Sequence, residues 1–369
     1  MIQPLSPIDA ISPAFQRTSE MLLARFRVSQ WLKIGFIGWL AGGAGYESLN
    51  LNTGSPRLPP GMRRGGVDPF KDLEKAIVTL QDWMLAHLFA IGVIVAFLMV
   101  VSLLFAYLNC RFRFIMMDAV LTADPNIERG WREYATQANS FFLFWVVLML
   151  ASWTGLYFAV ILPLWRVFKS GALSQGAPLE VLFTIIGGAV LKIVLFGLVF
   201  AIITTLANDF VVPILAVTNC SIADAFVRLK DMIAAETGSF AGYLGMKFLL
   251  HIAAGILIGV LFLIGFLVLL VPCIILSVVG AFIVAALKSA GIGGVILGAV
   301  LVGLFVLIVV ALVFLLALMS IAPRAVFFTA YALYFMGRRL PGLRTRLWPE
   351  PPAVVAPPMS GPLPPPAPA

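Results

Sequence analysis

The sequence predicts an all-α integral membrane protein, a bundle of about six transmembrane helices with amphipathic helices at the membrane interface. Of its 369 residues, 61% are apolar and only 11% are charged, whereas a soluble domain carries roughly 25% charged residues. The mean hydropathy is +1.04. Several apolar runs reach about 20 residues, the length that crosses the hydrocarbon as a helix. One water-soluble core cannot hold this much apolar surface, so the bilayer must be part of the solvent.

Six apolar runs are expected to cross the membrane. They are 31–45, 87–108, 141–163, 181–207, 242–271 and 293–322. The first of them is short. A further apolar run, 272–290, begins at Pro272 and ends before Gly291; it either crosses the membrane or returns as a re-entrant hairpin. The expected division is therefore an interfacial helix in 1–30, a transmembrane domain in 31–340 and a disordered proline-rich tail in 341–369.

Three segments carry the start signals and apolar stripes of amphipathic helices. In 13–30, Ser12-Pro13 is a start signal, and Phe15 begins the stripe, which Thr18, Leu22 and Phe26 continue. The helix expected in 124–138 starts at Asp124-Pro125. The helix expected in 221–237 starts at Ser221, with Asp224 three residues later as a variant of the capping box, and stops near Gly238. All three are predicted to lie in the interface.

Three spans end in similar polar breaks, "YLNCRFRFIMMDAVL" (107–121), "LANDFVVPILAV" (206–217) and "SIAPRAVFFTAYAL" (320–333). The echo between 109–141 and 208–240 hints at an internal repeat. Pro213 can kink or end the helix after Asp209. A carboxylate at a helix C-terminus opposes the helix dipole, so either water or a basic neighbour should compensate Asp209. We expect an ion pair with an arginine, the candidates being Arg111, Arg113, Arg228 and Arg324.

Three ionisable residues fall within the expected spans, namely Lys192, Lys247 and His251. Charge inside a membrane is costly, so each is a candidate for a polar functional site. Lys247 and His251 are four residues apart and share one helix face. The alternative is structural: the lysines reach an interface by snorkelling, and the histidine is packed and hydrogen-bonded.

The net charge is +8. In a membrane protein such an excess of basic residues lies mostly in cytoplasmic segments, so it does not indicate nucleic-acid binding. The N-terminal arm, 109–140 and the C-terminal end carry most of the arginines. We therefore expect a multi-pass protein of the inner cell membrane with a cytoplasmic C-terminus. The N-terminus is cytoplasmic only if 31–45 crosses; if that run lies in the interface, the N-terminus changes sides.

The sequence contains no nucleotide loop, metal-ligand cluster or catalytic triad; its two histidines and three cysteines are scattered. No cofactor and no enzymatic activity are expected. Two glycine pairs at GxxxG spacing, Gly255 with Gly259 and Gly294 with Gly298, allow close helix packing. They serve packing within the chain or self-association.

The segments "AFQRTSEMLLARFRVSQWLKIGFIGWLAG" (14–42), "CRFRFIMMDAVL" (110–121) and "NDFVVPILAV" (208–217) followed by "IADAFVRLK" (222–230) carry a resemblance. They resemble a family of uncharacterised polytopic membrane proteins related to the membrane domain of glycerophosphodiester phosphodiesterases. The resemblance implies a six-span helical fold without an established activity. The catalytic barrel of those enzymes, with its metal-binding carboxylates, has no counterpart in this sequence.

Three functions remain open: an accessory or structural membrane component, which the lack of chemistry favours; a transporter or lipid-handling protein; and an enzyme acting on phospholipid headgroups. The lipid bilayer is the expected partner. The three ionisable residues discriminate between the first two functions. Convergence on a polar cavity would favour transport or lipid handling, and separate snorkelling groups would favour the accessory role.

Overall fold

A computed structural model describes residues 4–24, 26–43, 86–169, 179–288 and 291–348. Within these ranges the chain is helical and contains no strand, which confirms the all-α prediction. In chain order the elements are α1 (Ile11–Leu22), α2 (Val28–Gly38), η1 (Trp39–Gly43), α4 (Leu88–Thr122), α5 (Ile127–Glu133), α6 (Ala135–Leu156), η2 (Tyr157–Ile161), α7 (Leu162–Lys169), α8 (Leu179–Leu206), η3 (Ala207–Val211), α9 (Val212–Thr218), α10 (Ile222–Ala235), α11 (Thr237–Lys288), α12 (Ile292–Gly337) and α13 (Pro341–Leu347). The η elements are π-helical turns.

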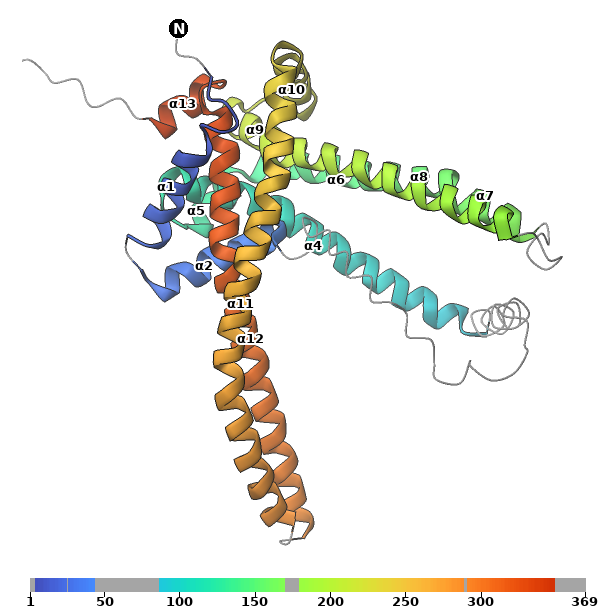
Figure 1. Ribbon diagram of the computed structural model, residues 1–369, viewed down its shortest axis with the longest axis vertical. Helices are drawn as coiled ribbons and strands as arrows, with labels where there is room; N and C mark the ends of the chain where they lie inside the picture. The colour runs from blue at the N-terminus through green and yellow to red at the C-terminus, as the bar shows by residue number, and fades with distance from the viewer. Residues whose placement is uncertain (1–3, 25, 44–85, 170–178, 289–290, 349–369) are drawn as a thin grey trace, which may run out of the picture.

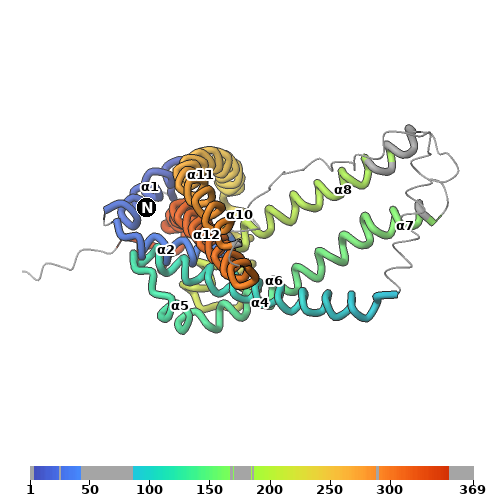
Figure 2. Tube along the Cα trace, turned by 90° about the horizontal axis from the view of Figure 1, so that it is seen from below, coloured from blue at the N-terminus to red at the C-terminus, as the bar shows by residue number. Residues whose placement is uncertain are grey.

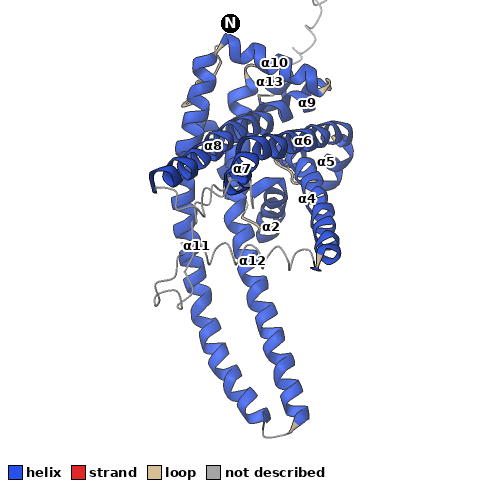
Figure 3. Cartoon of the chain, turned by 90° about the vertical axis from the view of Figure 1, so that its right-hand side faces the viewer, coloured by secondary structure: helices blue, strands red, loops and turns tan. Residues whose placement is uncertain are grey.

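The helices divide into a packed head and three apolar arms (Figure 1). The head contains α1, α2, η1, α5, α9, α10, α13 and the adjoining ends of the long helices. The first arm is the N-terminal part of α4, the second pairs α6–α7 with α8, and the third is the α11–α12 hairpin. Seen from below, the first two arms leave the head on the same side (Figure 2). Figure 3 shows the hairpin extending well beyond the rest of the molecule.

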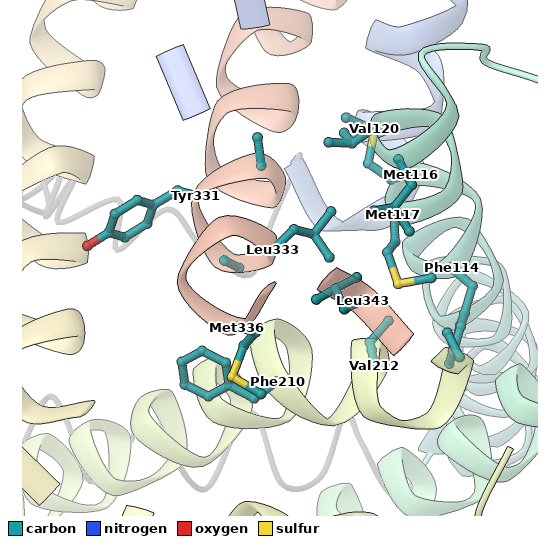
Figure 4. Packing of buried hydrophobic residues seen from close by; sticks show 14 of the residues in the cluster. Phe114, Met116, Met117, Val120, Phe210, Val212, Tyr331, Leu333, Met336 and Leu343 are labelled. Carbon is teal, nitrogen blue, oxygen red and sulfur yellow. The ribbon is translucent and has the colours of Figure 1, made fainter. Parts of the chain in front are cut away.

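The arms expose their large apolar side chains, whereas the head buries them. Along α4, Phe105 is 50% exposed, but Phe114 is fully buried in the head. The core of the head draws side chains from α4, η3, α9, α12 and α13 (Figure 4). Among the described residues, five helices are long and apolar enough to cross a membrane: Leu88–Thr122, Ala135–Arg166, Gly187–Thr218, Thr237–Leu287 and Ile292–Gly337. The chain is therefore a multi-pass membrane protein, since exposed apolar arms of this length require lipid around them.

Residues 31–45, expected to be the first span, do not form one of these five helices. Their described part, up to Gly43, belongs to α2 and η1, which lie in the head with Ile34 and Ile37 fully buried. Two glycines explain the burial. A β-carbon at Gly35 would collide with the carbonyl oxygen of Leu318, and one at Gly38 would lie 2.6 Å from the β-carbon of Ala325. The glycines thus let α2 lie directly against α12.

The re-entrant hairpin considered for 272–290 is absent up to Lys288, because α11 continues as one helix of 52 residues through Pro272. A proline removes one backbone hydrogen bond, which a membrane helix tolerates. Residues 341–347, expected to belong to the disordered tail, instead form α13, in which Leu343 is fully buried. Residues 349–369 lie outside the described residues.

The start signals of the amphipathic helices hold to different degrees. Ser221 accepts a hydrogen bond from the backbone N–H of Asp224 (3.2 Å), as the capping box predicts. In α5 the cap is Asn126 rather than Asp124. Helix α1 begins at Ile11, before the expected Ser12-Pro13; of its predicted stripe, Leu22 is buried and Phe15 is 67% exposed. Gly238 lies inside α11 rather than at a stop.

Proline positions explain two of the π-helical turns. Pro163 and Pro213 both follow a turn in which a backbone N–H donates five residues back, from Leu162 to Tyr157 and from Val212 to Ala207. A proline ring clashes with the carbonyl four residues earlier and donates no hydrogen bond to it. A π-helical turn contains one extra residue, so a proline after it neither clashes with that carbonyl nor leaves it without its expected donor.

The suspected repeat has a structural counterpart at two helix ends. The residue that follows α4, Ala123 (φ 59°), and the residue that follows α9, Asn219 (φ 48°), both have the left-handed conformation. A capped short helix follows each, α5 after Asn126 and α10 after Ser221. The chain therefore passes from a buried helix end into a capped short helix by the same local geometry twice.

Candidate functional site

Charged side chains gather where the long helices enter the head. Arg113 of α4, Asp209 of η3, Lys247 of α11 and Arg324 of α12 line one cavity of about 150 Å³. Each lies where its helix changes from exposed to buried. On α11, for example, Lys247 is 6% exposed and the next residue, Phe248, is 61% exposed. The cavity therefore lies at the boundary between the head and the apolar arms.

Asp209 and Lys247 form the ion pair of this cavity. The Lys247 ammonium nitrogen lies 2.7 Å from Oδ2 of Asp209, and the two side chains are 8% and 11% exposed. The Tyr243 hydroxyl donates to the same oxygen at 2.8 Å. Tyr243 stacks on Tyr331 of α12, with ring centroids 4.9 Å apart. The carboxylate is thus held by two residues of α11 that are one turn apart.

Arg113 is held in place by its neighbours on α4 and η1. Its Nε donates to Oδ1 of Asn109 at 2.9 Å. At Gly42, φ is +117°, a conformation that glycine adopts readily. A β-carbon there would lie 2.6 Å from Nη2 of Arg113. Gly42 therefore supplies both the kink at the end of η1 and the space that the guanidinium occupies.

Arg324 is partly buried and lines the cavity. Among the described residues it makes no ion pair or hydrogen bond, unlike the other cations of the cavity. Oδ1 of Asn208, on the same cavity wall, is buried and has no hydrogen-bond partner within the described part of the chain. The cavity thus contains polar groups that the protein itself leaves available.

Residues 5–346 match the model of DUF7544, a family of unknown function. The chain belongs to this family. No curated protein matches it, and no solved structure matches it. The match to DUF7544 carries no link to the membrane domain of the glycerophosphodiester phosphodiesterases, and it assigns no activity to the cavity.

The structure of this DUF7544 chain brings some of the sequence candidates together and separates others. Asp209 pairs with Lys247, not with the arginine that was expected. Arg113 and Arg324 nevertheless line the same cavity. Lys192 is exposed on α8, in the second arm, apart from the cavity.

The remaining candidates lie outside the cavity wall. Arg111 does not line it: the Arg111 guanidinium lies over the rings of Trp131 (4.8 Å) and Tyr107 (5.3 Å). Arg228 is exposed on α10. His251 lies one turn beyond Lys247, stacks on Phe328 and has Nδ1 2.8 Å from the Lys247 carbonyl oxygen. Because that oxygen can only accept, Nδ1 is the donor.

Sequence reasoning missed Tyr243, Gly42 and Asn208. Tyr243 could have been found, since it precedes Lys247 by four residues and therefore extends the stripe that Lys247 and His251 define on α11. Asn208 is adjacent to Asp209 and lies in the same turn. Gly42 gave no signal, because its role depends on the approach of Arg113 from a distant helix.

The two GxxxG pairs have different surroundings. Gly294 is buried, and a β-carbon at Gly298 would lie 3.2 Å from Cγ1 of Val284, so this pair packs against α11 within the chain. A β-carbon at Gly255 or Gly259 would meet no atom within 4 Å. The pair of Gly255 and Gly259 therefore does not contribute to helix packing among the described residues.

The arrangement around the cavity is suited to an anion. Three cationic side chains face one carboxylate, which already has Lys247 as its partner. Arginine guanidinium groups bind phosphate and carboxylate through two parallel hydrogen bonds. Their attraction for an anion is stronger beside low-dielectric apolar arms than in open water.

Proposed function

We propose that the chain is a non-catalytic, lipid-handling membrane protein that binds the acidic headgroup of a phospholipid in the polar cavity. The observation that carries this proposal is Arg324, a partly buried arginine that lines the cavity without a partner among the described residues. Arg113 and Lys247 add two further cations to the wall of the same cavity. An acidic headgroup at the membrane boundary would balance these charges.

Lys192, Lys247 and His251 do not converge, since only Lys247 lines the cavity, so lipid handling is supported instead by two contrasts with the other functions. A purely structural role explains Lys247, which pairs with Asp209, but gives no reason for Arg324 to line the cavity without a partner among the described residues. A headgroup-processing enzyme would need a base beside the bound phosphate. Asp209 is a poor candidate, because Lys247 and Tyr243 both bind its Oδ2. His251 does not line the cavity. The resemblance to a membrane domain of headgroup-processing enzymes is compatible with a headgroup ligand.

The proposal is tested by replacing Arg324 with glutamine. Purified protein in detergent micelles is titrated with phosphatidate and with phosphatidylcholine, and the apparent melting temperature reports binding. Phosphatidate should raise the melting temperature of the native chain, and phosphatidylcholine should not. Because a charge-assisted hydrogen bond is lost, Arg324→Gln should weaken phosphatidate binding about ten-fold. Arg228→Gln is the matched control, since Arg228 is exposed on α10. Equal responses to the two lipids would refute the proposal.

We also propose that the head faces the cytoplasm and that the C-terminus lies there, with the protein in the inner cell membrane. Support comes from the arginines of the head, such as Arg17, Arg129 and Arg346, since cytoplasmic segments carry an excess of basic residues. A green fluorescent protein fused after Trp348 should fluoresce in bacterial cells, because it matures in the cytoplasm. A fused alkaline phosphatase should be inactive at the same position.

Self-association is the remaining proposal about partners. Gly255 and Gly259 present a small-residue face on α11 that nothing in the described chain covers, and such faces allow helices of two chains to approach closely. Gly255→Leu should then reduce crosslinked dimer, whereas Gly298→Leu should instead destabilise the α11–α12 hairpin. A monomeric native protein in membranes would exclude this contact.

A further inference from the structure

A second cavity of about 240 Å³ adjoins the polar cavity, and its wall is mostly apolar. It lies between η1, α4, α6 and α8, and its apolar wall includes Trp39, Leu103, Ala106 and Phe200. An apolar cavity of about 150 Å³ holds a benzene molecule. The second cavity is therefore large enough for a segment of an acyl chain.

Arg113 and Gly42 belong to the walls of both cavities. The side chain at the boundary of the two spaces is Arg113 itself, because its guanidinium fills the space that Gly42, without a β-carbon, leaves open. The bond from Nε of Arg113 to Asn109, a residue of the apolar cavity, anchors the guanidinium at the boundary. The Arg113 guanidinium therefore lies at the boundary between the polar cavity and the apolar cavity.

The apolar cavity also reaches the outer surface of the first arm. Two residues of its wall, Leu103 and Phe105, are 37% and 50% exposed on α4. This arm is one of the helices long and apolar enough to cross the membrane, so its exposed side chains face hydrocarbon. A ligand can therefore enter from the lipid with its chain already in an apolar medium.

From this geometry we infer that the two cavities form one site for an acidic phospholipid of the surrounding bilayer. The phosphate lies between Arg113 and Arg324, and one acyl chain extends past the Arg113 side chain into the apolar cavity. This inference rests on the proposed headgroup binding and adds the chain to it. An inorganic anion would bind only in the polar cavity, and a neutral apolar molecule would bind only in the apolar cavity.

The test compares two probes, lysophosphatidate and inorganic phosphate, on the full-length protein in detergent micelles. The first variant is Ala106→Phe, which fills the apolar cavity from α4. It should weaken lysophosphatidate binding at least about ten-fold, because excluding about two methylene groups has that effect. Binding of inorganic phosphate should stay unchanged. Ala151→Phe is the matched control, since Ala151 is exposed on α6 and lies outside both cavity walls.

If Ala106→Phe does not fold, Ser102→Trp tests the same point from an exposed position of the cavity wall. Native-like lysophosphatidate binding in the folded cavity variant would overturn the inference, as would equal affinities of the native chain for the two probes. In both cases Arg324→Gln would still weaken binding, so the proposed headgroup function would stand. Failure of the native chain to bind either probe would overturn the function and the inference together.

Discussion

The ammonium nitrogen of Lys247 lies 2.7 Å from Oδ2 of Asp209, and this pair joins α11 to η3 at the inner end of two arms. Both side chains are almost fully buried. Two opposite charges placed together beside the hydrocarbon satisfy each other, but either one alone would be left in a medium that solvates it poorly.

Removing one partner of this pair should therefore be costly. Asp209→Asn and Lys247→Met should each destabilise the detergent-solubilised protein by about 3 kcal/mol, because a buried charge remains unpaired. The double variant should be more stable than the sum of the single effects predicts. Thermal unfolding of the four proteins measures the coupling. Lys192→Met, at an exposed position of α8, should change stability little; additive effects of the two pair variants would show that the ion pair is not coupled.

A second buried carboxylate stabilises the head. Asp118 is 5% exposed and binds Arg129 at 2.7 Å, and this hydrogen bond raises the pKa of the Arg129 guanidinium. Asp118→Ala should lower stability by about 2 kcal/mol, the scale of a lost charged hydrogen bond. Asp124 also contacts Arg129, at 3.5 Å, but is 61% exposed. Asp124→Ala should therefore cost at most about 1 kcal/mol. Equal melting temperatures of the two variants would contradict the assignment.

The packing of α2 against α12 depends on Gly35. A methyl group there would collide with the backbone at Leu318, and a backbone atom cannot give way as a flexible side chain can. Gly35→Ala should destabilise the head by about 3 kcal/mol, the upper end of overpacking effects. Gly245→Ala is the control, because a β-carbon at Gly245 meets nothing within 4 Å. Limited proteolysis should cleave only the first variant rapidly.

Truncation should separate the tail from the head. Ending the chain after Trp348 should leave membrane yield and melting temperature unchanged, since a segment so rich in proline cannot pack into a core. Ending it after Leu340 should lower both, because this removes α13 with the fully buried Leu343. Loss of a buried leucine alone costs about 3 kcal/mol. A large loss of yield in the shorter deletion would show that the tail contributes to insertion or folding.

Structural features that depend only on neighbouring residues in the chain were predictable from the sequence. The five long apolar runs, the cap at Ser221 and the break around Asp209 depend on neighbours in the chain. The partner of Asp209 was not predictable, because Lys247 reaches it only through the packing of α11 on η3. Lys247 and His251 were recognised as unusual from their apolar surroundings alone.

Residues 31–45 show that hydropathy alone does not predict whether an apolar helix faces lipid or the protein core. The apolar character of α2 is the same whether it faces lipid or the core of the head. What decides the outcome is the close approach of α12 at Gly35 and Gly38, a contact between segments about 280 residues apart that no window of sequence contains. The continuity of α11 through Pro272 is a similar case, since a proline is compatible with either a break or a bend.

The length of the α11–α12 hairpin restricts how the molecule can sit in a bilayer. From Phe248 to Leu287 the part of α11 in the hairpin arm measures about 60 Å at about 1.5 Å per residue, which is twice the roughly 30 Å of hydrocarbon. Such a hairpin fits a flat bilayer only when strongly inclined. The second arm runs crosswise to it (Figure 1), so inclining the hairpin turns α6 and α8 toward the membrane normal. The thickness of the surrounding lipid thereby sets the angle at which the head rests on the membrane surface.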